Sequence, residues 1–261
     1  MSEAKIMSVP ADPHAQLSPA EKDDFPCVEV PFREAVGSLM FLATVSRPDI
    51  AFAVNAISRH LNCYNNSHWQ AVKRIFRYLL GTINLGILYG NSKDGLQLKG
   101  YSDADYASDL GTRRSTTGYV FVLADGPVSW ASQRQKLVTL STTEAEYVAA
   151  AAAAKEAAWL RRLLNNLGCQ CEGATTLFVD NQSAIRLVKN PEFHQRTKHI
   201  DIRHHYIRER VQNSELCVNY VPTALQRADI LTKPLPKDRF RTLVLNLNLI
   251  RNREALKQGE C

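Results

Sequence analysis

The spacing of apolar residues divides the chain into a helical part and a part in which strands and helices are mixed. Between residues 32 and 82, apolar residues recur every three or four positions, which is the spacing of one face of an α-helix. Three helices are predicted there: FREAVGSLMFLATVS from residue 32, DIAFAVNAISRHLN after Pro48, and SHWQAVKRIFRYLLGT after Ser67. Residues 1–30 are polar, contain prolines and lack periodicity, so we expect a linker before these helices.

From residue 96 onward the pattern alternates between apolar and polar residues, which is typical of strands. Three strands in succession, followed by alternating helices and strands, predict an α/β fold with a five-stranded mixed sheet and flanking helices. This domain (96–236) is expected to follow a small all-α segment (31–90) and to precede a helical tail (237–261). Strands are predicted at residues 96–106, 115–124, 126–133, 174–180 and 215–222, and helices at 142–167, 182–190, 197–213 and 227–235.

The long helix carries two glutamates whose positions predict different roles. Ser141 and Glu144 have the spacing of a capping box, so Glu144 is explained by the start of the helix. At about 100° per residue, Glu146 instead shares a face with the stripe that runs from Ala149 to Leu167. A carboxylate on a buried face is costly unless it is paired or bound to a metal. Glu146 is therefore a candidate metal ligand.

Three aspartates also lie at the ends of predicted elements. Asp103 comes late in the first strand, where alternation places Asp105 on the same face, so either could reach a metal. Asp180 ends a strand and could equally cap the following helix. Asp229 opens the last short helix, where a favourable interaction with the helix dipole is the alternative.

Together these positions predict a cluster of like charges that needs cations. Carboxylates repel one another, and paired Mg²⁺ ions about 4 Å apart are suited to in-line cleavage of a phosphodiester. The four candidate catalytic and metal-binding residues are Asp103, Glu146, Asp180 and Asp229.

The charge of the chain agrees with an anionic partner, without identifying one. The formal net charge is +6 at pH 7. Lys73, Arg74 and Arg77 lie on the polar side of the third helix, where a solvated face and a phosphate-binding face both remain open. No N-terminal signal pattern and no apolar run of bilayer length occurs, so we expect a cytoplasmic or nuclear protein that is neither secreted nor membrane-bound.

The same segments resemble the ribonuclease H domain of copia-type (Pseudoviridae-like) retrotransposon polyproteins. The motifs GYSDADYA, RRSTTGYVF, VSWASQRQ, STTEAEY, VDNQSAI, TKHIDIRHHYIRE and ADILTKPLP carry this resemblance over about residues 96–236. Upstream, FREAVGSLMFLATVSRPDIAFAVN and HWQAVKRIFRYLLGT resemble the helical segment that follows the polymerase palm in such polyproteins, the thumb or connection of the reverse transcriptase.

The resemblance implies a ribonuclease H-like fold and a magnesium-dependent endonuclease that cuts the RNA strand of RNA–DNA hybrids during reverse transcription. Asp103 is then expected to contact both of two Mg²⁺ ions, for which Mn²⁺ can substitute. Asp229 is expected to complete the site of the ion that activates water, and Glu146 and Asp180 to hold the ion near the leaving oxygen. The implied partners are the hybrid and the polymerase portion of the polyprotein, with no small-molecule cofactor, and the implied location includes the virus-like particle of the element.

Such a hybrid is read mainly through its backbone and its 2′-hydroxyl groups. The chain also departs from the family, because it contains no Tyr-Val-Asp-Asp polymerase motif and no histidine in VPTALQRAD before Asp229. His199 or His204 could substitute, although a solvated basic helix explains these histidines as well. The candidate nucleic-acid contacts are Arg113, Arg114, Arg134, Lys136, Lys198, Arg203 and Arg208.

Two other functions stay open. One is a catalytically idle or co-opted remnant of an element that binds nucleic acid or protein without cutting. The other is a transposase or resolvase with the same fold, which the glutamate on the helix after three strands disfavours. The presence of all four carboxylates favours the nuclease.

Overall fold

The chain forms two compact units. Unit 1 comprises residues 1–88 together with 233–261, and unit 2 comprises residues 89–232. A computed structural model describes residues 4–15, 17–18, 30–90, 96–169, 173–189 and 201–251, and for 201–205 it describes only the backbone. In these parts of the chain, no helix combines the length and the apolar character that a membrane span requires.

Unit 1 contains the three predicted helices and a small sheet that the pattern did not predict. The second helix begins as a 3-10 turn at Pro48–Ile50, because proline fits the first helical position. Asn65 caps the third helix, since its side chain accepts hydrogen bonds from the N–H groups of Ser67 and His68. The helices are α1 (Phe32–Val45), α2 (Ala51–Ser58), α3 (Asn66–Gly81) and α7 (Lys237–Asn246), and β1 (Leu85–Ile87) pairs antiparallel with β7 (Leu249–Arg251).

Residues near the N-terminus lie along α3. The N–H of Met7 donates to the carbonyl oxygen of Arg77 at 3.4 Å, and Arg74 forms an ion pair with Asp12 at 3.0 Å. Val9 is buried. Part of the segment that we expected to be a linker therefore packs on unit 1, and one of the three cations on α3 is engaged by this segment.

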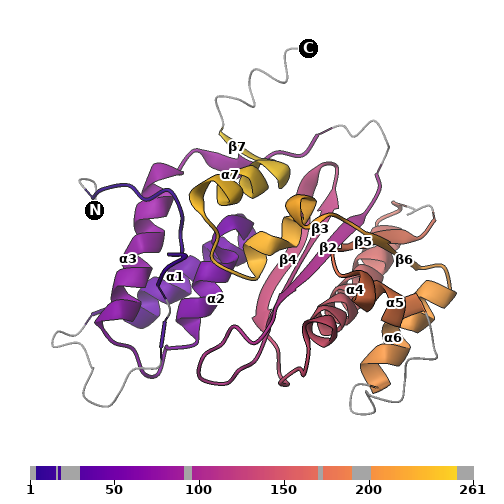
Figure 1. Cartoon of the computed structure of the whole chain (residues 1–261). Coiled ribbons are helices and arrows are strands. Elements are labelled where there is room, and N and C mark those ends of the chain that lie inside the picture. Colours follow the sequence, from indigo (N-terminus) through magenta and orange to yellow (C-terminus); the bar gives the residue numbers. More distant parts are fainter. Residues whose placement is uncertain are drawn as a thin grey trace. The chain divides into compact units, whose positions relative to one another are not determined.

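Unit 2 is built on the predicted five-stranded mixed sheet, with the strand order β4-β3-β2-β5-β6 (Figure 1). β3 pairs antiparallel with β2 and β4, whereas β5 pairs parallel with β2 and β6. The α/β fold class and the mixed sheet with flanking helices are confirmed. The strands are β2 (Lys99–Asp105), β3 (Thr116–Leu123), β4 (Gly126–Arg134), β5 (Thr175–Val179) and β6 (Leu216–Tyr220).

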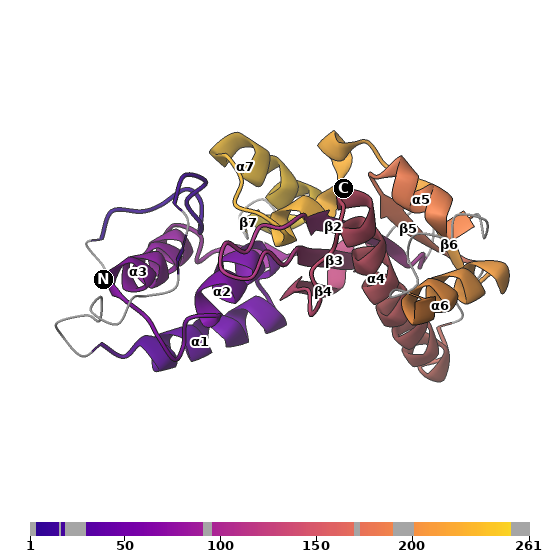
Figure 2. The same ribbon diagram turned by 60° about the horizontal axis from the view of Figure 1, so that its bottom comes forward.

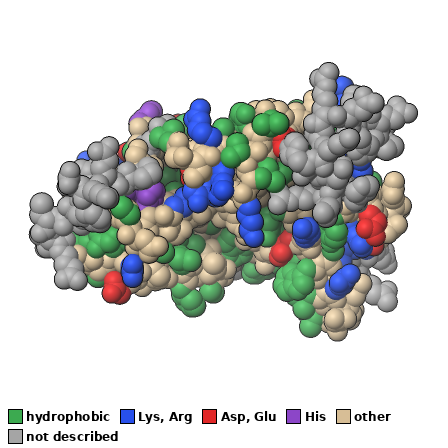
Figure 3. All heavy atoms as spheres, turned by 90° about the horizontal axis from the view of Figure 1, so that it is seen from below, with side chains coloured by type: hydrophobic (Ala, Val, Ile, Leu, Met, Phe, Trp, Pro, Cys, Tyr) green, Lys and Arg blue, Asp and Glu red, His purple; other side chains and the backbone are tan. Residues whose placement is uncertain are grey.

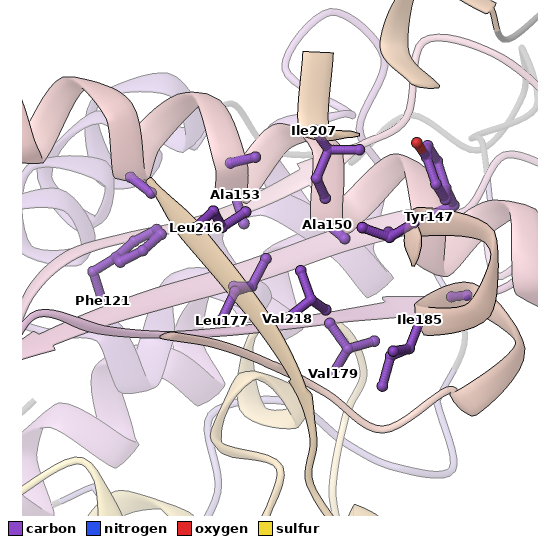
Figure 4. Close-up of a cluster of buried hydrophobic side chains, with 14 of the residues drawn as sticks. Phe121, Tyr147, Ala150, Ala153, Leu177, Val179, Ile185, Ile207, Leu216 and Val218 are labelled. Carbon is purple, nitrogen blue, oxygen red and sulfur yellow. The ribbon is translucent and has the colours of Figure 1, made fainter. Parts of the chain in front are cut away.

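One face of this sheet is covered by three helices, α4 (Thr142–Asn166), α5 (Gln182–Lys189) and α6 (Asp201–Gln212), which lie together in Figures 1 and 2. The run of alanines in α4 allows the helix to approach the sheet closely. Figure 4 shows its side chains beside those of the strands and of the other two helices. The buried cluster includes Phe121, Tyr147, Ala150, Ala153, Leu177, Val179, Ile185, Ile207, Leu216 and Val218.

The opposite face of the sheet receives a short 3-10 helix, η5 (Arg227–Leu231), where the pattern predicted a helix at 227–235. A Cβ atom added at Gly118 would lie 2.7 Å from Thr232 and 2.8 Å from Leu231. Phe121, three positions along β3, belongs to the α4 side, and an odd separation in a strand changes the face. Gly118 thus lets η5 approach the sheet on the side away from α4.

Candidate active site

The parallel pairing of β2 and β5 brings Asp103 and Asp180 together. Tyr101 pairs with Phe178 in this register, and each aspartate lies two residues further along its own strand direction. Asn181, and not Asp180, caps α5, because its Oδ1 accepts a hydrogen bond of 2.9 Å from the N–H of Ala184. The alternative in which Asp180 caps this helix therefore does not apply.

The first turns of α4 add Glu146 to these two aspartates. α4 packs against β2, and one carboxylate oxygen from each of Asp103, Glu146 and Asp180 lies within 4.8 Å of the other two. Asp103 and Glu146 are buried, and Asp180 is half-buried. Asp105, the alternative on β2, is half-buried and is not part of this group.

Electrostatics in this group favour a bound cation. Burial raises the pKa of Glu146 well above its usual range, and the negative charges of Asp103 and Asp180 raise it further. The Oε2 atom of Glu146 is buried and has no hydrogen-bond partner among the described residues. Oxygen ligands of this kind fit Mg²⁺ or Mn²⁺, so the residues present agree with the divalent ions that the resemblance implies.

Glu144 has a different surrounding, although it is also buried. Its N–H donates to the Ser141 side chain at 3.2 Å, and its Oε2 accepts from the N–H of Leu140 at 2.7 Å. The expected capping role is therefore present, with the difference that the carboxylate reaches the residue before the cap. Glu144 contacts the start of α4 and is absent from the carboxylate group.

The fourth candidate, Asp229, is buried in η5. It is not among the three carboxylates that lie within 4.8 Å of one another. Thr232 connects the backbone of this segment to the group, since its Oγ1 is 2.5 Å from Oδ2 of Asp103 and 3.1 Å from the backbone oxygen of Asp229. A second hydroxyl, that of Thr223, donates to Oδ2 of Asp180 at 2.8 Å.

The sequence pattern did not identify these two threonines, nor Gln226, which is completely buried. Gln226 donates from Nε2 to the backbone oxygen of Ser102 at 2.9 Å and accepts from the N–H of Ala228 at 3.2 Å. It occupies the segment in which no histidine was found. The only local signal was that Thr232 follows Asp229 by one helical turn.

The basic residues predicted to contact nucleic acid have different surroundings. Arg113 and Lys136 are exposed, and Arg114 is half-buried. Arg134 forms an ion pair with Asp109 at 2.9 Å. Burial raises the pKa of that aspartate, but hydrogen bonds from Thr112 and the contact with Arg134 outweigh it, so the pKa is lowered.

The remaining predicted contacts lie in α6 or before it. Arg208 is buried, and its guanidinium donates twice to the carbonyl oxygen of Leu187, at 2.6 and 3.1 Å. This contact gives Arg208 a structural role, joining α6 to α5. Lys198, His199 and the side chains of Arg203 and His204 lie outside the described residues. On the face of the molecule in Figure 3, Lys and Arg side chains are spread among apolar and uncharged ones.

Two relatives among known proteins match most of this chain. The chain is 46% identical over 247 residues to the Retrovirus-related Pol polyprotein from transposon TNT 1-94 of Nicotiana tabacum, which covers 92% of this chain and 18% of that protein. It is 42% identical over 222 residues to the corresponding polyprotein from transposon RE2 of Arabidopsis thaliana, covering 84% of this chain and 15% of that protein. The chain belongs to the copia-type retrotransposon Pol polyproteins.

This copia-type chain spans less than a fifth of the length of those two relatives. No family model matches it. Among solved structures, LC11-RNase H1, isolated from compost by a metagenomic approach, superimposes with a TM-score of 0.40 at 17% identity, over 52% of this chain and 92% of that chain. A similarity of this size says nothing about activity.

Proposed function

We propose that this copia-type chain is a metal-dependent ribonuclease H that hydrolyses the RNA strand of RNA–DNA hybrids. The observation that carries the proposal is the group formed by Asp103, Glu146 and Asp180, whose carboxylates converge from two parallel strands and one helix. A buried group of like charges has no stabilising role without a cation. The relatives of this chain are named Pol polyproteins, and a ribonuclease H is consistent with that name.

In this proposal the four carboxylates divide the work. Glu146 and Asp180 would hold one ion together with Asp103, and Asp103 and Asp229 would hold a second. When bound, two such ions supply the positive charge that neutralises the scissile phosphate and lower the pKa of an attacking water. The rigid strands position Asp103 and Asp180 before substrate binds, which reduces the entropy lost on reaching the reactive arrangement.

The hybrid is proposed to lie against the loops beside the carboxylates. Arg113 and Lys136 are exposed on the β2–β3 and β4–α4 loops, and the ion pair between Arg134 and Asp109 joins the end of β4 to the β2–β3 loop. Contacts from such side chains to phosphates would bind any sequence, as expected for recognition by backbone shape. The polymerase portion of the polyprotein is the proposed protein partner.

Three duplexes of the same sequence test the function: an RNA–DNA hybrid, duplex RNA and duplex DNA, each labelled on both strands. With Mg²⁺ the full chain is expected to cut only the RNA strand of the hybrid, and a chelator or the Asp103→Asn substitution to abolish cutting. Binding of the hybrid without cutting would support a binding module instead. Cutting of duplex DNA would support a transposase or resolvase.

A further inference from the structure

Thr232 lies between the carboxylate of Asp103 and the backbone of Asp229, and it is completely buried. Its Oγ1 is 2.5 Å from Oδ2 of Asp103 and 3.1 Å from the backbone oxygen of Asp229. One hydroxyl thus contacts the side chain of the carboxylate on β2 and the backbone of the segment that carries the carboxylate on η5. The hydroxyl has one proton to donate, and Oδ2 of Asp103, which lies far away in the sequence, is the nearer of the two acceptors.

The methyl group of Thr232 is fixed as well. Gly118 pairs with Asp103 across β2 and β3, and a Cβ atom at Gly118 would lie 2.7 Å from Cγ2 of Thr232 and 3.1 Å from the backbone oxygen of Ala228. The side chain of Thr232 therefore packs against the bare backbone of β3. A β-branched side chain held in this way has little rotational freedom, so its hydroxyl stays directed at Asp103.

The other end of η5 is attached to β2 by Gln226. Its side chain bonds the backbone oxygen of Ser102, next to Asp103, and the N–H of Ala228 inside η5. The segment carrying Asp229 is thus attached to β2 on both sides of the aspartate. Among these contacts between the segment and β2, the hydroxyl of Thr232 is the one that reaches the carboxylate of Asp103 itself.

We propose that Thr232 is a positioning residue, whose hydroxyl orients the carboxylate of Asp103 relative to Asp229 and thereby sets the affinity of the site for a divalent cation. This inference rests on the proposed function, in which the carboxylates hold such ions. A ligand already held in one orientation loses less conformational entropy when the ion binds. Removing a residue that hydrogen-bonds to a metal ligand typically weakens metal binding on the order of 10-fold to 100-fold.

Four variants separate the hydroxyl from the shape of the side chain. Thr232→Val keeps the shape and removes the hydroxyl, whereas Thr232→Ser keeps the hydroxyl and removes the methyl group. Thr232→Ala differs from Thr232→Ser only in the hydroxyl, so this pair decides the question if the valine variant does not fold. Thr175→Val is the matched control, because Thr175 is equally buried at the opposite end of β5, where its hydroxyl accepts from Arg161 at 3.0 Å.

The experiment measures the affinity of the full chain for Mn²⁺ without nucleic acid. The electron paramagnetic resonance signal of the unbound ion reports how much Mn²⁺ remains free. Circular dichroism confirms that each variant is folded. Thr232→Val and Thr232→Ala are expected to weaken binding by about 10-fold or more. Thr232→Ser and Thr175→Val are expected to bind as the wild type does.

Wild-type affinity in Thr232→Val, or a loss in Thr232→Ser equal to that in Thr232→Ala, would overturn the role of the hydroxyl while leaving the proposed function intact. A wild-type chain that binds no Mn²⁺ at these carboxylates would overturn both. A loss in Thr175→Val equal to that in Thr232→Val would show that any buried hydroxyl has this effect, and would also overturn the inference.

Discussion

Asp103 and Gly118 lie directly opposite each other in the antiparallel pair formed by β2 and β3. The central carboxylate of the group therefore faces the position at which the sheet carries no side chain. This absence allows Thr232 and Leu231 to approach within a distance that a Cβ atom would not permit. The carboxylate and the glycine are thus parts of one arrangement, in which the missing side chain makes room for the segment that bears Asp229.

Gly118→Ala is expected to lower the stability of unit 2 by about 1–3 kcal/mol, because the added methyl group meets side-chain and backbone atoms that cannot move freely. It is also expected to weaken hybrid cleavage by displacing η5. Gly37→Ala in α1 is the control, since a Cβ atom there meets nothing within 4 Å. Thermal unfolding measures the first effect. Equal stability of Gly118→Ala and the wild type would mean that the close approach of η5 is unimportant.

Glu146→Gln is expected to affect the rate of cleavage, whereas Glu144→Gln is expected to affect stability. Losing a proposed metal ligand should reduce the rate of hybrid cleavage by about 100-fold or more, because removing a mere hydrogen-bond partner of a ligand already lowers metal affinity or activity by about 10-fold to 100-fold. Losing the charge that accepts from Leu140 should cost about 1 kcal/mol of stability and leave the rate near that of the wild type. Single-turnover rates and urea unfolding of both variants decide this. The reverse pattern would assign the chemistry to Glu144.

The raised pKa of Glu146 predicts a particular pH dependence of the metal-free protein. Between the ordinary value of 4.5 and the raised pKa, the folded chain retains a proton that the unfolded chain releases. Stability therefore falls as the pH rises through this window, and it is unaffected by Glu146 below the window. With a chelator present, the melting temperature of Glu146→Gln minus that of the wild type is expected to increase as the pH is raised. A difference that does not change with pH would contradict the raised pKa.

The pattern of the sequence predicted the sheet and three of the carboxylates because these depend on local regularities. Glu146 shares a helical face with buried alanines, Asp103 lies late in a strand with an alternating pattern, and Asp180 directly follows an apolar strand. The contacts that support them were not readable. The Thr232 hydroxyl reaches a residue 129 positions away, and Gln226 reaches one 124 positions away. Nothing in the local spacing indicates which polar side chain will lie beneath a particular carboxylate.

The pairing of β1 with β7 was missed for a related reason. Each strand has only three residues, too few for an alternating pattern, and the partner strand lies at the other end of the chain. For Arg208, the sequence pattern suggested a surface contact, and the structure shows an internal one. A basic helix suggested phosphate contacts, whereas burial against α5 gives this guanidinium a carbonyl partner inside the domain.

Asp229→Asn is expected to be inactive with Mg²⁺ and to retain part of its activity with Mn²⁺. Asp229 lies on a short 3-10 helix and outside the close group of three carboxylates, so it is the most peripheral of the four proposed ligands. An asparagine offers a neutral amide oxygen in place of the carboxylate. Mn²⁺ tolerates a poorer ligand set than Mg²⁺ does, so this variant should support Mn²⁺ better. Rates on one hybrid with both ions are compared. Asp103→Asn is the control, expected to be inactive with either ion. Undiminished Mg²⁺-dependent cleavage by Asp229→Asn would place the fourth ligand elsewhere.

The central claim is that the converging carboxylates form a metal centre, and anomalous X-ray diffraction from crystals of the full chain grown with Mn²⁺ tests it most directly. The account predicts an anomalous peak between Asp103, Glu146 and Asp180, with carboxylate oxygens at about 2–2.5 Å from the ion, and no such peak in crystals of Glu146→Gln. Peaks found only away from these three residues, at ion concentrations that support cleavage, would contradict it.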